Sequence, residues 1–151
     1  TKSASDTLDR ITNMGLKPYI LASALDTIIA QRLVRKLCTH CKEEKVKTPE
    51  ETQLVKEMMK EIGMKWLKAD HIKLYHGKWC EYCNNSWFKW RIWIYEMISL
   101  NDKIRQIIRD GATTEEIIAE SRKIDMITMK EDGILKAIQW YTSIEEVLKV
   151  V

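Results

Sequence analysis

Glycine is scarce in this sequence, at 5 of 151 residues, whereas average usage of about 7% predicts roughly 10 or 11. No apolar run approaches the roughly 18 residues that span a bilayer. The first ten residues lack the charged and apolar regions of a signal peptide and resemble the cut edge of a longer chain. With 45% hydrophobic and 31% charged residues and a net charge of +3, the sequence predicts a globular chain that needs neither nucleic acid nor acidic lipid as a partner.

Signatures of catalysis are also missing from the chain. It contains no GxxxxGK[ST] phosphate loop, no HExxH zinc-protease motif, no nucleophile elbow and no obvious pair of catalytic acids. We therefore predict no catalytic residues and no activity for this chain alone.

The four cysteines form two Cys-x-x-Cys pairs, Cys38 with Cys41 and Cys80 with Cys83, and 38 residues lie between the pairs. Each pair can direct two thiolates at one centre, and two pairs supply the four soft ligands of a tetrahedral zinc site. Because the protein would fill every coordination position, no position remains for a substrate or an activated water. We predict a structural Zn²⁺.

Other uses of the cysteines stay open on the sequence alone. Two disulfides would need an oxidising compartment, a redox motif would need one pair, and an iron–sulfur cluster usually has different spacings. His40 lies inside the first pair and could compete as a ligand. We expect His40, His71 and His76 to be ordinary surface or loop residues.

A helix is predicted between the two pairs. Thr48 has the features of an N-cap, Pro49 suits the first helical position, and Glu51 completes a capping box. Gly63 is a stop signal. The apolar face comprises Leu54, Val55, Met58, Met59 and Ile62. The metal would thus close the base of a helical excursion.

The flanking segments predict an α+β, mainly helical fold. Helices are expected over 4–14 and 19–26, and strands over 28–36 and 91–98, which would pair as antiparallel neighbours. After residue 100 the pattern predicts a small helical bundle. Its start and stop signals are Asn101, Gly111, Thr113 or Thr114, an Asp132–Gly133 pair that breaks or begins a helix, and Ser143 with Glu146.

These pieces together resemble the C-terminal end of the type II secretion and type IV pilus-assembly ATPases. The resemblance rests on "MGLKPYILASALDTIIAQRLVRKLCTHCK" from Met14 to Lys42, on the second cysteine pair, and on "EDGILKAI" and "TSIEEVLKV". The stretch from Ser86 to Glu96, "SWFKWRIWIYE", matches a family motif close to Thr-Gly-Tyr-x-Gly-Arg-x-Gly-Ile-Tyr-Glu. The opening "TKSA" resembles the residues after the family's histidine box.

The resemblance implies an organisation in three parts. Residues 1–37 would end a RecA-like ATPase core, residues 38–83 would form the tetracysteine zinc-binding subdomain, and residues 84–151 would hold a return strand and a helical end. The phosphate loop and the other nucleotide-binding boxes would lie before Thr1. Gln31, Arg32 and Arg91 match the family pattern, but the sequence gives them no chemical role.

The function implied by the resemblance is that of a bacterial motor. The full-length parent would be a cytoplasmic hexamer that binds ATP and Mg²⁺, lies at the inner membrane and works with a platform protein there. Neither nucleic acid nor a transmembrane segment is expected. The sequence does not distinguish secretion, pilus extension and DNA uptake as the role of the parent.

The tryptophans depart from the family pattern, which has glycine at five of their six positions. These positions are Trp79, Trp87, Trp90, Trp93 and Trp140, whereas Trp66 lies in the variable insert. Five exchanges to one residue type suggest a systematic cause. UGA is read as Trp in some genetic codes and as Gly in another, so translation with the wrong code is our hypothesis.

An alternative interpretation is that the tryptophans are genuine and form a binding surface. Trp87, Phe88, Trp90 and Trp93 beside Lys89 and Arg91 would form a stacking platform for single-stranded nucleic acid on a zinc ribbon. A protein-interaction module without an enzymatic parent is the other alternative.

Overall fold

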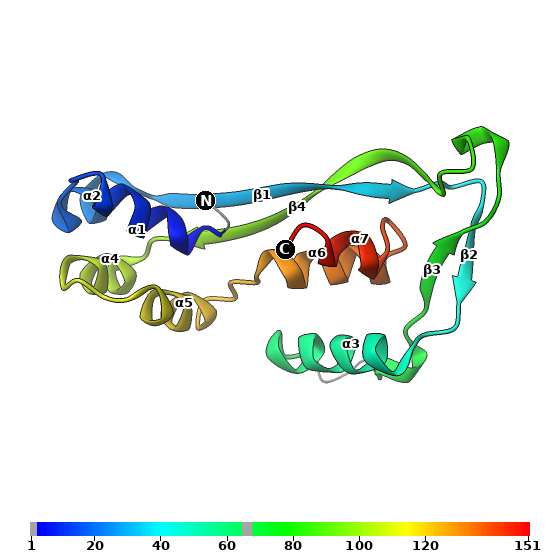
Figure 1. Cartoon of the computed structure of the whole chain (residues 1–151). Helices are drawn as coiled ribbons and strands as arrows, with labels where there is room; N and C mark the ends of the chain where they lie inside the picture. The colour runs from blue at the N-terminus through cyan, green and yellow to red at the C-terminus, as the bar shows by residue number, and fades with distance from the viewer. Residues whose placement is uncertain (1–2, 65–67) are drawn as a thin grey trace. The chain divides into compact units, whose positions relative to one another are not determined.

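The computed structural model describes residues 3–64 and 68–151, and Trp66 lies outside them. The chain forms two compact units, one made of Thr1–Gln31 and Tyr95–Met129 and the other of Arg32–Ile94 and Lys130–Val151. Two long strands, β1 (Thr27–Leu37) and β4 (Phe88–Ser99), pair with each other, run in opposite directions and pass through both units (Figure 1). The antiparallel pair predicted from the sequence is confirmed.

Helices form most of the first unit. They are α1 (Ser5–Asn13), α2 (Pro18–Ala24), α4 (Asp102–Arg109) and α5 (Thr114–Arg122). Helix α4 packs against α2 and α5, and α5 also packs against α1. The predicted caps are confirmed, because the side chains of Asn101 and Thr113 accept backbone N–H bonds in the first turns of α4 and α5. Burial of isoleucines such as Ile104 and Ile117 then holds these short helices together.

A buried carboxylate joins β4 to two helix beginnings in the first unit. Glu96 is 6% exposed. Its Oε1 accepts the N–H of Ala4 at 2.8 Å, and its Oε2 accepts the N–H of Met129 at 3.3 Å. Ala4 precedes α1, and Met129 begins α6 (Met129–Ile138). A carboxylate is stabilised at such positions because helix N-termini carry unpaired N–H groups and partial positive charge.

The second unit holds the excursion between the cysteine pairs. Strands β2 (Lys42–Lys45) and β3 (Leu74–Gly77) pair antiparallel with Lys42 opposite Gly77, and helix α3 (Pro49–Glu61) and the short 3₁₀ helix η1 (Ala69–His71) lie between them in the chain. The predicted capping box of Thr48 and Glu51 is present. The hydrophobic core here combines residues of the excursion with residues from later in the chain, and it comprises Val55, Met58, Met59, Ala69, Ile72 and Leu74 together with Ile134, Ala137 and Ile144.

The helices after residue 100 fall into both units rather than one cluster. Helices α4 and α5 belong to the first unit, whereas α7 (Ile144–Leu148) and α6 from Lys130 onward belong to the second. The expectation for Asp132–Gly133 was wrong, since Gly133 lies inside α6 and neither breaks nor begins it. A Cβ at Gly133 would lie 2.4 Å from Cγ1 of Val147, so close packing of α6 on α7 accounts for the glycine.

Substitution of Gly133 by Ala should therefore destabilise the chain. Alanine favours a helix interior by about 1 kcal/mol over glycine, but the clash with the fully buried Val147 should cost more, leaving a net loss of about 1–3 kcal/mol. Urea unfolding monitored by circular dichroism measures this loss. The double variant Gly133→Ala/Val147→Ala should lose less than the two single losses added together, whereas simple additivity would contradict the steric explanation.

Candidate metal centre

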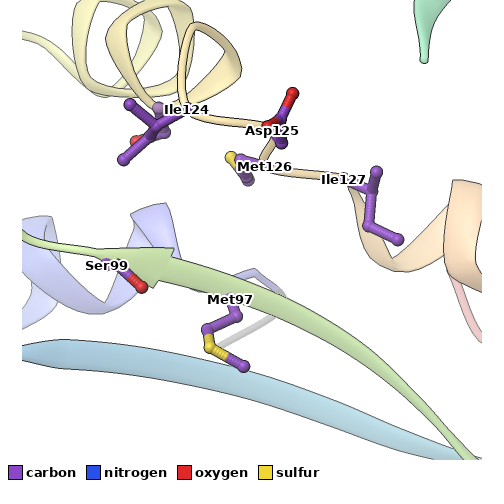
Figure 2. Close-up of a pocket in the computed structure, with 7 residues that line it drawn as sticks. Met97, Ser99, Ile124, Asp125, Met126 and Ile127 are labelled. Carbon is purple, nitrogen blue, oxygen red and sulfur yellow. The ribbon is translucent and has the colours of Figure 1, made fainter. Parts of the chain in front are cut away.

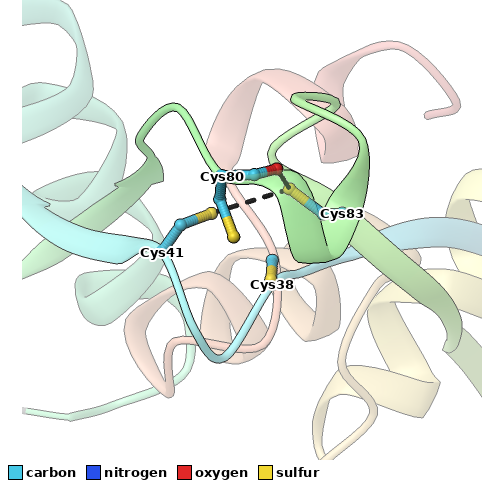
Figure 3. Close-up of side chains that lie close together, drawn as sticks. All are labelled: Cys38, Cys41, Cys80 and Cys83. Atoms are coloured by element: carbon cyan, nitrogen blue, oxygen red, sulfur yellow. Dashed lines mark hydrogen bonds between the residues drawn. The ribbon is translucent and has the colours of Figure 1, made fainter.

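The four cysteines stand at the ends of secondary-structure elements of the second unit. Cys38 follows β1, Cys41 precedes β2, Cys80 follows β3, and Cys83 ends the 3₁₀ helix η2 (Glu81–Cys83). Figure 3 shows the four side chains directed at a common centre. Their Sγ atoms all lie within 4.8 Å of one another. The structure thus brings together the four residues that the spacing singles out.

The arrangement fits one tetrahedral ion better than the other uses of the thiols. Zinc–sulfur bonds of about 2.3 Å place tetrahedral sulfurs about 3.8 Å apart, and Sγ of Cys41 and Sγ of Cys83 are 3.8 Å apart. All four cysteines are free, and 3.8 Å is far beyond the roughly 2.05 Å of a disulfide. A four-iron cluster needs more room between its ligands. That these cysteines bind zinc stays a prediction.

Crowding and burial govern the ionisation of the thiols. Burial raises the pKa of Cys41 to about 12, and hydrogen bonds with Cys83 and Cys38 add to the increase. Burial also acts to raise the pKa of Cys83, but the N–H of Trp87 and the neighbouring thiols donate to its sulfur and hold the pKa below its ordinary value. Four thiolates this close repel one another unless a cation lies among them. Metal binding must therefore release protons and should weaken as the pH falls.

Backbone bonds hold the two cysteine loops in place. The N–H of Lys42 donates to the carbonyl of Cys38 at 3.1 Å, and the N–H of Cys38 donates to the carbonyl of Trp87 at 3.0 Å. Asn85 clamps the second loop, because its Oδ1 accepts the N–H of Cys80 at 2.8 Å and its own N–H donates to the Cys80 carbonyl at 2.9 Å.

Sequence reasoning missed Asn85, although a signal was present. Asn84 and Asn85 follow the second pair directly and have φ of 51° and 57°. Asparagine is one of the few residue types that adopts such backbone readily. The Asn-Asn pair could therefore have indicated a tight turn that closes the second cysteine loop.

None of the three histidines belongs to the group of potential ligands that the cysteines form, and His76 lies in strand β3 rather than in a loop. His40 is exposed and its ring stacks on Tyr82 with centroids 3.9 Å apart. His76 contacts Glu43 across the β2–β3 pair, with Nε2 and Oε1 3.1 Å apart. Within residues 3–64 and 68–151, the four cysteines are the group of potential ligands close enough to share one ion.

An ion pair anchors the strand that leads into Cys38. Arg35 donates two hydrogen bonds of 2.6 Å to the carboxylate of Glu146, which is 6% exposed. The Arg35 carbonyl accepts the hydroxyl of Thr142 at 2.8 Å, and the N–H of Leu37 donates to the carbonyl of Tyr141 at 2.9 Å. These bonds tie the end of β1 to the segment around α7. Sequence analysis did not single out Arg35, because no local pattern points to a partner 111 residues away.

Glu146 consequently fulfils only half of the predicted capping box. The hydroxyl of Ser143 accepts the N–H of Glu146 at 3.4 Å, as expected for an N-cap. The Glu146 carboxylate instead contacts Arg35 and Lys149. The bond from Arg35 is the main cause that lowers the pKa of Glu146 to about 2.

The hollow shown in Figure 2 offers no candidate chemistry. It measures about 260 Å³ and lies in the first unit, where Met97 and Ser99 of β4 face the loop from Ile124 to Ile127. Its lining is mainly methionine and isoleucine, and Ser121 already donates its hydroxyl to the Ile117 carbonyl. Asp125 has no histidine or second acid in this lining to act with.

Gln31 and Arg32 of β1 and Arg91 of β4 are placed on the long strands, and the geometry assigns them no chemical role. Across the described part of the chain, no helix combines the length and the apolar character that crossing a bilayer demands.

Comparison with known proteins shows the relationship of the chain. The model of the family described as "Type II/IV secretion system protein" matches residues 1–149. The chain is 39% identical over 150 residues to the type IV pilus assembly ATPase PilB of Pseudomonas aeruginosa, a match that covers 99% of this chain and 25% of that protein. PilB of Thermus thermophilus is 36% identical over 148 residues, covering 98% of this chain and 16% of the relative.

The secretion branch is represented as well. Type II secretion system protein E of Dickeya dadantii is 35% identical over 150 residues, covering 99% of this chain and 28% of the relative. The chain thus spans between a sixth and about a quarter of the length of these relatives. Since the family model covers nearly all of it, this chain belongs to the type II/IV secretion system protein family.

Proposed function

We propose that this chain is the metal-binding C-terminal portion of a motor ATPase that powers type IV pilus assembly or type II secretion. Four Sγ atoms within 4.8 Å, supplied by two Cys-x-x-Cys loops, carry the metal-binding part of this proposal. The named relatives, which are pilus assembly ATPases and a type II secretion protein, support the motor part.

The four cysteines would hold a structural Zn²⁺ that supplies cross-linking and no reaction step. Cys38 directly follows β1, and Cys83 is five residues before β4, so the ion would fasten these two strands at one end. It would also close the base of the β2–α3–β3 excursion. We assign residues 38–83 to this subdomain, residues 1–37 to the end of a RecA-like core, and residues 84–151 to the return strand and helical end.

The nucleotide chemistry would belong to the rest of a longer protein. ATP and Mg²⁺ would bind there, since the chain itself contains no phosphate loop. The complete protein would work as a homohexamer in the cytoplasm, at the inner membrane, with a platform protein as its partner. The chain described here would pass nucleotide-driven motion to its neighbours.

Metal analysis and an ATPase assay test this proposal together. The purified 151-residue chain, kept reduced, should contain one zinc per chain by atomic absorption and should not hydrolyse ATP, whereas the intact gene product should do both. Absence of stoichiometric metal would overturn the zinc assignment. An intact gene product without a phosphate loop or ATPase activity would overturn the motor assignment.

An oligonucleotide titration separates the alternative function. If Trp87, Trp90 and Lys89 form a platform for single strands, a fluorescent oligonucleotide should bind at low salt and dissociate as salt is added. We expect no binding.

A further inference from the structure

Three tryptophans have a backbone conformation that is unfavourable for them. The φ angles of Trp87, Trp90 and Trp140 are 69°, 72° and 69°. In this left-handed region the Cβ of an L-residue approaches its own backbone too closely, and for a bulky side chain a positive φ is a genuine outlier. The other non-glycine residues described there are two asparagines and one aspartate, which tolerate the region.

Trp140 occupies a position that glycine fills elsewhere in this chain. After α6, the N–H of Tyr141 donates to the carbonyl of Lys136 at 2.9 Å, five residues back. The same bond follows α3, where Gly63 has φ of 73°, and α4, where Gly111 has φ of 79°. This is the Schellman ending of a helix, in which the left-handed residue is usually glycine.

Trp87 lies where two backbones meet beside the metal centre. Its carbonyl accepts the N–H of Cys38 at 3.0 Å, and its N–H donates to the sulfur of Cys83, so both backbone polar groups of residue 87 are committed. An ideal Cβ built on Gly77 would lie only 2.2 Å from the Cβ of Trp87. Glycine is commonly used where two backbone segments approach each other this closely.

The side chain of Trp90 contributes little stabilisation through burial. The residue is 78% exposed although it stands within β4. A left-handed residue inside a strand is characteristic of a bulge of the kind that glycine fills. The strain at Trp90 is therefore not balanced by buried apolar area.

We propose that residues 87, 90 and 140 are glycine positions of the fold and that the natural protein carries glycine at all three. The gene would encode them with UGA, which one genetic code reads as tryptophan and another as glycine. The shortage of glycine, 5 of 151 residues, is consistent with such a gene. Trp79 and Trp93 do not have positive φ, so their backbone does not by itself require the exchange.

Codons and peptide masses test the identity of these residues. We expect UGA at all three positions in the gene, and glycine in peptides covering them from the protein isolated from its source cells. UGG codons there, or tryptophan in those peptides, would overturn the proposal.

Stability measurements test the backbone requirement separately. Trp90→Gly should raise the folded-to-unfolded ratio about five-fold or more over Trp90→Ala, because alanine removes the ring but keeps the Cβ. Trp93→Gly is the matched control and should be less stable than Trp93→Ala, since glycine weakens an ordinary strand position. Equal stability of the two Trp90 variants would contradict a glycine requirement at that position.

The metal centre provides a second readout, which rests on the proposed function. Trp87→Gly should bind Zn²⁺ more tightly than Trp87→Ala in a competition titration with a coloured chelator. Equal affinities would contradict the glycine requirement at position 87 without affecting the zinc assignment, whereas no binding by any variant would contradict the zinc assignment itself.

Discussion

Removal of metal from the reduced chain with a chelator should unfold the segment between the two cysteine pairs. Structural zinc contributes about 10–16 kcal/mol in small zinc domains, which matches or exceeds the 5–15 kcal/mol that stabilises a typical domain. Strands β2 and β3 have four residues each, and a two-stranded hairpin is marginal by itself. We therefore expect loss of far-ultraviolet circular dichroism and rapid proteolysis within residues 42–79, both reversed by added Zn²⁺.

Single cysteine substitutions should reproduce the effect. Cys41→Ser and Cys83→Ser each remove one thiolate from the cluster, so the chain should retain little zinc by colorimetric assay and should resemble the chelated form. His40→Ala is the matched control, because His40 lies between two of the cysteines in sequence yet contacts Tyr82 instead. A chain that contains no metal when reduced, and whose spectrum is unchanged by chelator, would contradict the zinc assignment.

The Arg35–Glu146 pair should provide a second large effect, outside the metal centre. Arg35→Met should cost about 1.5–3 kcal/mol, the range for hydrogen bonds to charged groups, because it leaves the buried Glu146 carboxylate with Lys149 as its remaining ion-pair partner. We expect a value toward the lower end, since the Arg35 side chain is 47% exposed and solvent weakens the pair. Guanidinium unfolding of the two chains measures the difference.

The Arg35–Glu146 pair should also make the stability of the chain depend on pH in the acid range. Folding lowers the pKa of Glu146 from 4.5 to about 2, so its contribution to stability is complete above pH 4.5 and is lost as the pH falls toward 2. Glu146→Gln should be less stable at neutral pH and should lack this part of the acid dependence. Lys149→Met is the control and should retain most of it, because Arg35 supplies the main cause of the shift. A parent chain with flat stability between pH 5 and 2 would contradict the assignment.

Local sequence signals predicted the elements of this fold well. Thr48, Asn101 and Thr113 were recognisable as N-caps because such caps act within four residues of the chain. Alternation of side chains along residues 28–36 and 91–98 likewise indicated the two long strands. The spacing of the two cysteine pairs predicted that their four thiols lie close together, since two Cys-x-x-Cys loops are the usual source of four thiolates for one centre.

Contacts between distant segments could not be predicted in this way. Glycine stands at position 133 inside α6 because Val147 packs closely against it, whereas the local pattern indicated a residue that breaks or begins a helix. Glu96 accepts bonds from residues 92 positions before and 33 positions after it, so its burial had no local signal.

The sequence by itself determined the family of this protein, the capped helices, the paired strands and the four thiols, because each depends on residues that are close in the chain or on a motif of fixed spacing. The tertiary structure decided how the helices after residue 100 divide between the units, which partner Arg35 takes, and where the backbone needs glycine. Those features depend on which surfaces pack together in the folded chain. Neither the local pattern of side chains nor secondary-structure propensity specifies these contacts.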